Sequence, residues 1–581
     1  YDSAGVAVLD GGKLSVVRAV GKLQNLQKEL ATRPAPGAIG IGHTRWATHG
    51  KPSETNAHPH TSGRVTVVHN GIIENYAAIK ERLQKEGRIF QSETDTEVIS
   101  HLIDWRLAQG DDFPEAVRGA LGELRGSYAV VALDREDPAR LVAAKTSSPM
   151  VLGRGDGASF VASDIPAVLG RAEEFAFLLD GEMAVLDRGG FRVTTLAGDP
   201  VEKTFERIRW SPAMAEKGGY KHFMLKEIHE QPIALADTLA GRTSATTGSV
   251  YLEEFELSPK DLLRLQRVVL LGCGTTYHAA LLGKHLIERI ARLPAEVDLS
   301  SEFRYRSPVV DDGTLALCIS QSGETADTLG ALAEAKRLGC PTLAVTNVMG
   351  SSISRAADWT VYTHAGPEIS VASTKAFTSQ VALLYLMAVF LGRARGALDG
   401  KTARGLIQDV RAVPEQMTRI LDRADEVHEI ARRYMHAEHF LYLGRGLSFP
   451  VALEGALKLK ELSYIHAEGY AGGEMKHGPI ALIDESTPVA FVAPRDETFE
   501  KIASNMEEVR ARGGRVLAVR TEGERDLDGK VSDSFFVPAS APPVAPLLTS
   551  LPLQLLAYHI ADLRGTDVDQ PRNLAKSVTV E

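Results

Sequence analysis

Residues 315–328 have the sequence LALCISQSGETADT, in which an apolar run is followed by hydroxyl residues, a glycine and a helix-forming segment. The apolar run predicts a buried strand, and residues 320–325 form the turn into the helix. Backbone N–H groups and the helix dipole at such a turn face an anion, and hydroxyl groups add further donors. The stretch therefore predicts an α/β unit with an anion-binding loop.

Two further segments carry the same chemistry. Residues 272–276 (GCGTT) follow an apolar strand of their own, and residues 371–374 (VAST) form a third hydroxyl-rich segment. Serine and threonine often only cap helices, and one such loop alone would favour that explanation. Three of them favour a phosphate site, and the absence of a Gly-x-x-x-x-Gly-Lys motif argues against a nucleoside triphosphate. A small phosphorylated metabolite is the predicted ligand.

The unit around this stretch occurs twice. Residues 268–274 are echoed by 440–446, and residues 342–345 by 516–519, at an interval of about 170 residues that suits tandem domains. Strands alternate with helices throughout the second half of the chain, as in βαβ units with a parallel sheet. The first half instead contains short strands broken by Gly, Asn and Pro, which predicts an α+β domain with antiparallel strands. Its clearest predicted elements are strands at 64–68, 127–133 and 140–144 and a helix at 97–108.

The composition excludes several classes of protein. The 581 residues are 44% apolar and 24% charged, as in soluble globular proteins of several domains, and a formal net charge of -10 leaves no footprint for nucleic acid or anionic lipid. The longest apolar stretch, 381–391, is too short to span a bilayer and predicts a buried helix. Cys273, Cys318 and Cys340 lack metal-ligand spacing and fit a reducing cytoplasm. We expect a cytoplasmic protein with no membrane or nucleic-acid partner.

Charged residues in the second half follow a helical spacing. Glu454, Lys458 and Glu461 share one face of a predicted amphipathic helix, although an exposed ion pair is the commoner meaning of such spacing. Residues 466–479 then place several ionisable groups in a glycine-rich loop, which can hold acid–base groups against a ligand. Lys576, near the C-terminus, has the pattern of a solvated tail lysine when it is considered alone.

These segments resemble the isomerase half of the glucosamine 6-phosphate synthase family, which is built from two sugar-isomerase (SIS) domains. The resemblance rests on CGTTY (273–277), SQSGETADT (320–328), VASTKAFT (371–378), ALEGALKLKELSYIHAEGYAGGEMKHGP (452–479) and DVDQPRNLAKSVTVE (567–581). It implies that fructose 6-phosphate is a substrate. Its phosphate would be held by Ser320, Gln321, Ser322, Thr325 and Thr275, and its sugar by Val371, Ser373 and Ala575.

The same resemblance implies the chemistry. Lys576 would form a Schiff base with the C2 carbonyl of the open-chain sugar, which turns a poor electrophile into an iminium that ammonia can attack. Glu461 would move a proton between C1 and C2, with Lys458 assisting close by. His477 would arrive from the neighbouring subunit and open the sugar ring, so a homodimer is expected. This chemistry requires no cofactor.

A polar segment in the first half combines a guanidinium, an indole and two imidazoles at residues 42–50 (GHTRWATHG). Arg45 within it suits bidentate recognition of an amino-acid carboxylate. His58 and His60 suggest a metal, but no cysteine or further carboxylate completes the geometry, so no metal site is predicted.

Two local patterns follow in the same half. Asn70 and Gly71 lie between apolar runs and predict a type I′ hairpin turn, which would also present an amide and an N–H as an oxyanion hole requires. Thr94 and Glu97 have the spacing of a capping box, in which Asp95 would be no more than a first-turn acid.

The first half resembles the N-terminal-nucleophile glutamine amidotransferases. The resemblance rests on YDSAG (1–5), HTRWATHG (43–50), NAHPH (56–60), VVHNGIIENY (67–76) and SETDTEV (92–98). The implied roles are a glutamine clamp at Arg45 and Asp95 with Thr48 and His49 beside it, an oxyanion hole at Asn70 and Gly71, and an ammonia gate at Trp46.

The sequence departs from this second family at its start. The family's nucleophile is a cysteine at the mature N-terminus, whereas residue 1 is tyrosine and the three cysteines all lie in the isomerase half. We therefore expect a missing N-terminal segment, and we expect the glutaminase half to be inactive without it.

Together the resemblances imply an α+β N-terminal-nucleophile glutaminase domain of sandwiched antiparallel sheets, followed by two α/β SIS domains with parallel sheets. The predicted division is a glutaminase domain at 1–205, a linker at 206–224, SIS domains at 225–395 and 426–571, a helical connection at 396–425 and a catalytic tail at 572–581.

The implied reaction converts D-fructose 6-phosphate and L-glutamine to D-glucosamine 6-phosphate and L-glutamate, with ammonia channelled between the sites. It is the first step of UDP-N-acetylglucosamine synthesis. An ammonia-dependent isomerase or deaminase with a dead glutaminase is one alternative, and the intact glutamine-pocket residues argue against it. A sugar-phosphate sensor is another, but it would need no Glu461, Lys576 or His477. The loops that mark asparagine synthetase and the phosphoribosyl diphosphate enzyme of purine synthesis are absent from the sequence.

Overall fold

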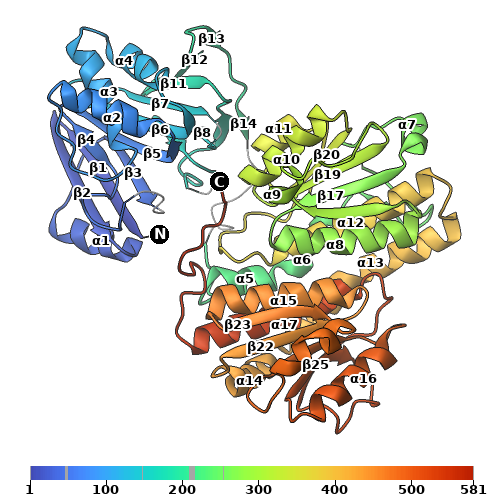
Figure 1. Cartoon of the computed structure of the whole chain (residues 1–581). Helices are drawn as coiled ribbons and strands as arrows, with labels where there is room; N and C mark the ends of the chain where they lie inside the picture. The colour runs from blue at the N-terminus through green and yellow to red at the C-terminus, as the bar shows by residue number, and fades with distance from the viewer. Residues whose placement is uncertain are drawn as a thin grey trace. The chain divides into compact units, whose positions relative to one another are not determined.

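The computed structural model describes residues 2–45, 50–146, 148–165, 167–207, 216–252 and 254–579. The chain divides into two compact units, one formed by Tyr1–Ala215 with Arg572–Glu581 and the other by Glu216–Pro571 (Figure 1). The C-terminal segment therefore belongs to the first unit, although it follows the second in the sequence.

The first unit is built around a seven-stranded antiparallel sheet in the order β13-β12-β11-β7-β6-β5-β4. Its strands are β4 (His60–Ser62), β5 (Val65–Ile73), β6 (Gly126–Asp134), β7 (Leu141–Thr146), β11 (Glu182–Asp187), β12 (Gly190–Thr195) and β13 (Pro200–Val201). Two smaller sheets have the orders β2-β1-β3 and β14-β10-β8-β9. Their strands are β1 (Ser3–Asp10), β2 (Lys13–Val20), β3 (Ile39–Arg45), β8 (Val151–Gly155), β9 (Ala158–Ala162), β10 (Glu174–Phe177) and β14 (Glu206–Arg207). The helices are α1 (Leu23–Thr32), α2 (Tyr76–Lys85), α3 (Glu97–Ala108) and α4 (Phe113–Leu121).

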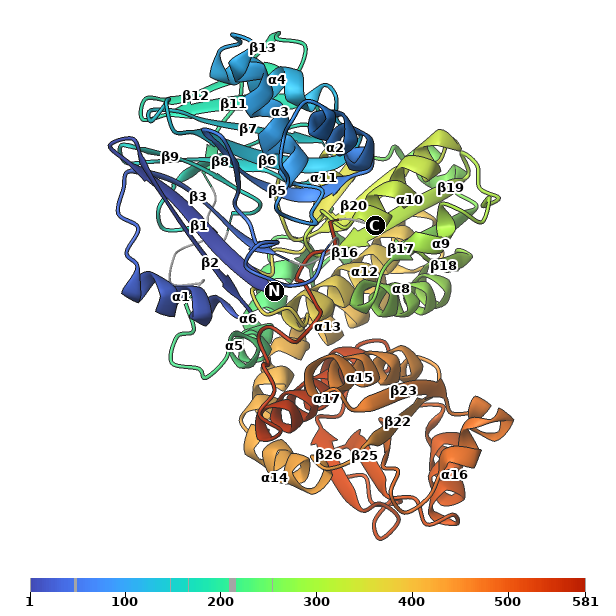
Figure 2. The same cartoon turned by 60° about the vertical axis from the view of Figure 1, so that its left-hand side comes forward.

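Along the strands of the seven-stranded sheet, successive side chains point to opposite faces: one face packs against helices and the other against the two smaller sheets. On β5, Val65 and Val67 face the core shared with α2, α3 and α4, whereas Val68 faces the three-stranded sheet. On β6, Val130 faces the helices and Ala129 faces the four-stranded sheet. Figure 2 shows α3 and α4 over one face of this sheet and β8 and β9 over the other. The predicted α+β class with sandwiched antiparallel sheets is confirmed.

The helix predicted at 97–108 is confirmed as α3, and the predicted strands lie within β5, β6 and β7 apart from residues 64 and 140. The hairpin turn predicted at Asn70 and Gly71 is wrong, because β5 continues to Ile73 and pairs Gly71 with Tyr128 of β6. Gly71 has φ +143°, and a Cβ atom there would lie 2.0 Å from the Ser127 carbonyl oxygen. The glycine is required by this close approach of β6, and not by a turn.

The second unit contains two five-stranded parallel sheets, in the orders β18-β17-β19-β20-β21 and β23-β22-β24-β25-β26. The first comprises β17 (Arg267–Gly272), β18 (Ala295–Leu299), β19 (Thr314–Ser320), β20 (Thr342–Thr346) and β21 (Trp359–Tyr362). The second comprises β22 (His439–Gly444), β23 (His466–Ala471), β24 (Val489–Ala493), β25 (Val516–Thr521) and β26 (Asp533–Val537), and a small hairpin is formed by β15 (Thr243–Ser244) and β16 (Ser249–Val250). Each sheet places its first strand second in the order, so the predicted duplication is confirmed.

Helices cover both sheets of this unit (Figure 1). Those before and within the first lobe are α5 (Phe223–His229), α6 (Gln231–Leu239), α7 (Pro259–Arg264), α8 (Thr275–Leu286), α9 (Ser300–Phe303), α10 (Ala326–Arg337), α11 (Ser352–Ala356) and α12 (Lys375–Ala394), with a π-helical turn η2 (Ile287–Ala291). The remainder are α13 (Gly400–Leu421), α14 (Ala424–Tyr434), α15 (Ser448–Ser463), α16 (Phe499–Arg510) and α17 (Ala545–Leu563), with short 3₁₀ helices η3 (Glu474–His477) and η4 (Pro479–Leu482).

The helix α12 contains the stretch predicted at 381–391. The helix extends past the predicted stretch at both ends, and its 20 residues are long and apolar enough to cross a membrane by length and composition only. The prediction of a buried helix is confirmed, because 94% of its most apolar window is buried in the core of the first lobe.

Candidate active sites

The loop between β19 and α10 is the predicted phosphate loop. The Ser320 side chain, 2% exposed, accepts a hydrogen bond from the Gly323 N–H at 3.0 Å and lies 2.9 Å from the Thr325 hydroxyl. Gly323 has φ +69°, and a Cβ atom there would lie 2.1 Å from the Ser351 hydroxyl oxygen. Glycine alone fits this position, and the loop therefore turns tightly into α10.

The rest of the loop is joined to a second one. The Ser322 hydroxyl accepts from the Glu324 N–H at 3.2 Å, and the Gln321 carbonyl accepts from the Asn347 N–H at 3.1 Å. The Asn347 side chain in turn donates to the Gly366 carbonyl at 2.7 Å. The segment that begins at Gly366 contains Val371 and Ser373, which are both half-buried. The predicted phosphate loop and this segment, which we call the sugar loop, are thus neighbours.

Thr275 lies at the same edge of the sheet. It is the first residue of α8, which follows β17, and β17 pairs directly with β19. The Cys273 sulfur lies 3.9 Å from the Thr328 hydroxyl of α10. Because the carboxyl ends of parallel strands share one edge, the turn at Thr275 and the phosphate loop lie side by side.

The charged face predicted on α15 is buried. Glu454 and Lys458 are each 1% exposed, so the alternative of an exposed ion pair is wrong. The Lys458 Nζ lies 3.3 Å from the Glu454 carboxylate and also donates to the Glu461 carboxylate. Glu461 is the more accessible of the two carboxylates, with a side chain 15% exposed.

Two residues of α8 complete this cluster. The Thr275 hydroxyl donates to Glu454 at 3.0 Å and accepts from Lys458 at 3.1 Å, so it bridges both partners. The His278 Nδ1 lies 2.7 Å from the other Glu454 oxygen. Sequence analysis assigned no role to Glu454 or His278. The sequence contained one indication: His278 follows Thr275 by one helical turn, so both side chains lie on the same face of α8.

The electrostatics of the cluster follow from its pairing. Burial alone would lower the pKa of Lys458, but the carboxylates of Glu454 and Glu461 raise it above its usual value. Burial would raise the pKa of Glu454, but the Lys458 ammonium and the hydrogen-bond donors of α8 hold it below its usual value. Lys458 therefore remains protonated at neutral pH, and it can orient a carboxylate but cannot act as a nucleophile.

The remaining residues predicted for the isomerase site lie elsewhere in the chain. His477 is the last residue of η3 and its side chain is exposed. In the described part of the chain, it makes no hydrogen bond to Lys458 or Glu461. Ala575 and Lys576 are half-buried in the C-terminal segment that belongs to the first unit.

In the first unit, Arg45 is the last residue of β3 and is 4% exposed. Its guanidinium donates to the Gly50 carbonyl at 3.1 Å and lies 3.9 Å from the Asp2 carboxylate. Burial lowers the pKa of Arg45, an effect partly offset by the carboxylates of Asp2 and Asp95. The other residues predicted in this segment, Trp46, Thr48 and His49, lie outside the described residues.

Asp95 connects the segment before α3 to β5. Its carboxylate is buried and accepts a hydrogen bond from the Ile73 N–H at 2.8 Å. Asn70 and Gly71 precede Ile73 on the same strand, and both are half-buried. The structure therefore brings Asp95 to the strand that carries the predicted oxyanion hole.

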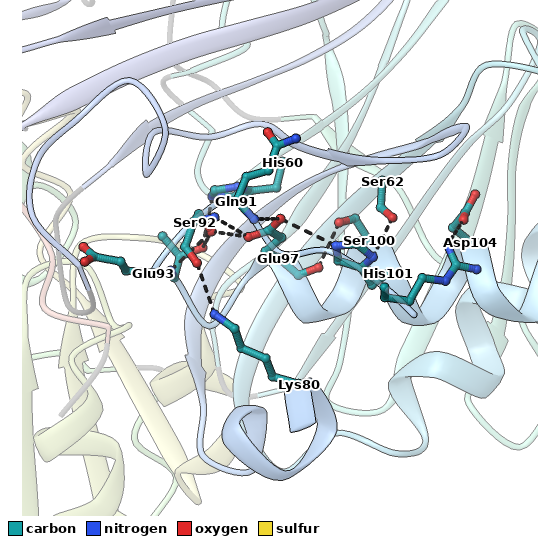
Figure 3. Close-up of polar contacts among 12 residues, drawn as sticks. His60, Ser62, Lys80, Gln91, Ser92, Glu93, Glu97, Ser100, His101 and Asp104 are labelled. Carbon is teal, nitrogen blue, oxygen red and sulfur yellow. Dashed lines mark hydrogen bonds and ion pairs between the residues drawn. The ribbon is translucent and has the colours of Figure 1, made fainter. Parts of the chain in front are cut away.

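The capping box predicted between Thr94 and Glu97 is wrong, because Glu97 is the first residue of α3. Its carboxylate accepts from the N–H groups of Gln91 at 2.8 Å and Ser92 at 2.6 Å (Figure 3). Burial alone would raise the pKa of Glu97, but His101 and these donors lower it to about 2. The carboxylate thus anchors the segment that leads into the helix.

Four histidines lie beside these residues: His58, His60 and His69 are buried, and His43 is half-buried. The rings of His43 and His58 stack at 4.2 Å. Burial lowers the pKa of His43 and of His60 to about 3, so both rings are neutral at physiological pH. Among the residues that the structure describes, no group of three or more His, Cys, Asp or Glu is arranged to hold a metal ion.

Comparisons with known proteins cover both units. The SIS domain family matches residues 261–390 and 434–563, and the glutamine amidotransferase domain family matches residues 43–170. The isomerizing glutamine–fructose-6-phosphate aminotransferase of Symbiobacterium thermophilum is 50% identical over 583 residues, which cover 100% of this chain and 95% of that relative. A protein of the same name from Thermus thermophilus is 51% identical with the same coverage. The chain belongs to the isomerizing glutamine–fructose-6-phosphate aminotransferase family.

A solved structure agrees with this membership. The C-terminal domain of glucosamine-fructose-6-phosphate aminotransferase from Francisella tularensis matches with 40% identity and a TM-score of 0.59, over 61% of this chain and 100% of its own. The predicted family and the two SIS domains are confirmed.

Proposed function

We propose that the chain converts fructose 6-phosphate and glutamine to glucosamine 6-phosphate and glutamate. The observation that carries the proposal is the buried cluster of Lys458, Glu454 and Glu461. Lys458 and Glu454 are hydrogen-bonded to Thr275, which lies at the same edge of the parallel sheet as the phosphate loop. Relatives at 50% identity bear a name that states both substrates. No step of this chemistry draws on a cofactor.

The phosphate of the sugar binds the loop after β19. Backbone N–H groups at the start of α10 and the hydroxyls of that loop are donors, as anion sites at helix N-termini require. The binding residues are Ser320, Gln321, Ser322 and Thr325, with Thr275 beside them and with Val371, Ser373 and Ala575 against the sugar.

Amination passes through a covalent intermediate. The Lys576 amine attacks the C2 carbonyl of the open-chain sugar and water leaves, which gives an iminium. Ammonia then adds at C2, and the Lys576 amine leaves. Glu461 takes the proton from C1 and returns it to C2, and the protonated Lys458 holds that carboxylate in place. The accessibility of Glu461 relative to Glu454 supports this division of roles.

Ring opening falls to His477 of a second subunit. Its side chain is exposed and is not hydrogen-bonded to Lys458 or Glu461 in the described part of its own chain. An imidazole can both donate and accept a proton near neutral pH, as the opening of a hemiketal requires. The proposed assembly is therefore a homodimer. A cytoplasmic location is also proposed, and it is supported by three cysteines that form no disulfide.

The first unit carries the residues proposed to bind glutamine, whose hydrolysis would supply ammonia. The cysteine nucleophile that the resemblance implies is not among them, because the three cysteines lie in the isomerase half. Arg45 and Asp95 bind the carboxylate and the ammonium of the amino acid. Asn70 and Gly71 stabilise the tetrahedral oxyanion. The roles of Trp46, Thr48 and His49 remain predictions from the resemblance.

The test measures glucosamine 6-phosphate formed from fructose 6-phosphate with ammonium as the nitrogen donor, and then with glutamine. With ammonium, product formation depends on the sugar-phosphate site alone and not on glutamine hydrolysis. With ammonium we expect product in the wild type, and none with Lys576→Ala. Binding of fructose 6-phosphate without any product in the wild type would contradict the proposal and favour a sugar-phosphate sensor.

A further inference from the structure

Asp569 lies between α17 and the C-terminal segment, and it holds three parts of the second unit together. Its carboxylate oxygens accept hydrogen bonds from the N–H groups of Phe223 and Met224, both at 3.0 Å. Its backbone carbonyl accepts from the Val371 N–H at 3.0 Å. Lys217 lies 3.3 Å from the same carboxylate, which is 14% exposed.

The contact with Phe223 and Met224 caps α5. The residue before this helix, His222, makes no side-chain cap in the described structure, and the first N–H groups of a helix need acceptors. A carboxylate supplies them and also interacts favourably with the helix dipole. Asp569 therefore fixes the start of α5, the first helix after the segment that links the two units in the sequence.

The helix α5 also binds the backbone of the sugar loop directly, through residues that follow its capped end. One Glu227 oxygen accepts from the N–H groups of Ile369 at 2.6 Å and Ser370 at 3.2 Å. Glu230 pairs with the buried Lys375 at 2.7 Å. Three successive N–H groups, those of residues 369, 370 and 371, are thus bound either by α5 or by the residue that caps it.

We propose that Asp569 is a positioning residue for sugar binding, which couples the start of α5 to the loop that carries Val371 and Ser373. The proposal rests on the function proposed above and adds a residue that does not touch the substrate. If the carboxylate is removed, α5 loses its cap, and Val371 and Ser373 lose their fixed place beside the phosphate loop. The expected effect is on sugar affinity, because Asp569 makes no hydrogen bond to the proton-transfer residues of α15 in the part of the chain that the structure describes.

The test compares Asp569→Ala, Asp569→Asn and a matched control, Asp562→Asn. Asp562 forms an ion pair at 2.5 Å with Lys221, which lies just before α5. In the described structure Asp562 makes no hydrogen bond to α5 or the sugar loop. With ammonium as the nitrogen donor, we expect Asp569→Ala to raise KM for fructose 6-phosphate about tenfold with little change in kcat. Asp569→Asn keeps one acceptor oxygen and should show a smaller rise. The control should stay within about twofold of wild type, as for an exposed ion pair.

A KM for Asp569→Ala equal to that of Asp562→Asn would overturn the proposal. A fall in kcat at unchanged KM would also overturn it, because that result would place the effect on chemistry. If Asp569→Ala does not fold, Asp569→Asn decides by the same comparison. An inactive wild type would instead contradict the proposed function itself, so the two failures are distinguishable.

Discussion

The Nζ atom of Lys458 lies 3.3 Å from the Glu454 carboxylate, and the two side chains are 1% and 2% exposed. The Thr275 hydroxyl bonds to both, so a residue of the first lobe lies between two charges of the second. A buried pair of this kind is costly to break, because the remaining charge is left without its partner in a low-dielectric interior.

Glu454→Gln should therefore destabilise the second unit by about 3–5 kcal/mol. The measurement is the change in unfolding free energy from urea denaturation. Glu429→Gln is the control, because Glu429 forms an exposed ion pair with Arg432 and should cost at most about 1 kcal/mol. Equal costs for the two variants would show that the buried pair has no special role.

Glu461→Gln should leave fructose 6-phosphate binding intact and lower kcat about 10²–10⁴-fold, as expected for loss of a general base. Lys458 keeps Glu454 as a partner in this variant, so the fold should be retained. The assay uses ammonium, and Lys460→Gln on the exposed side of the same helix is the control. Unchanged turnover in Glu461→Gln would assign the proton transfer to another residue.

Gly323→Ala should disrupt the phosphate loop. The cost combines a strained φ of +69°, about 1–3 kcal/mol, with overlap against Ser351. Gly339→Ala separates the two effects, because Gly339 has φ +86° and no described atom within 4 Å of the added Cβ. A large rise in KM for fructose 6-phosphate is expected only for Gly323→Ala. A similar rise in both variants would contradict the proposed role of the loop.

Acid should destabilise the first unit over a defined range. His43 and His60 have folded-state pKa values of about 3, below the usual value of 6.5. The unfolded chain therefore binds more protons between pH 6.5 and pH 3, and stability falls as the pH falls through that range. Calorimetric melting temperatures should drop between pH 7.5 and pH 5. The drop should be smaller in His60→Gln, and an identical drop would contradict the assignment.

Much of this architecture could be predicted from the sequence. The duplication was visible because each buried parallel strand is a continuous apolar run, and the bounds of α3 followed from helical periodicity. The Asn70–Gly71 turn was mispredicted, because the reason for the glycine is the Ser127 carbonyl of a strand that lies far along the chain. A local sequence pattern does not show which distant backbone atoms come close to a residue.

The candidate site was predicted less completely. Residues within one loop, such as Ser320 and Thr325, were found because their chemistry is contiguous. Glu454 and His278 were missed as partners because they are 176 residues apart and meet only when α8 packs on α15. A sequence pattern gives the face of a helix, but the partner of that face depends on tertiary packing.

The burial of α12 also has a consequence during synthesis. This helix is as apolar as a membrane span, and in the finished fold it packs against α6, α8 and α13. A nascent chain that has emerged only as far as Ala394 still lacks α13, so part of its most apolar segment stays open to water. Translation through Leu421 adds α13, but α12 also packs against α17, so its cover is complete only after Leu563 has been made.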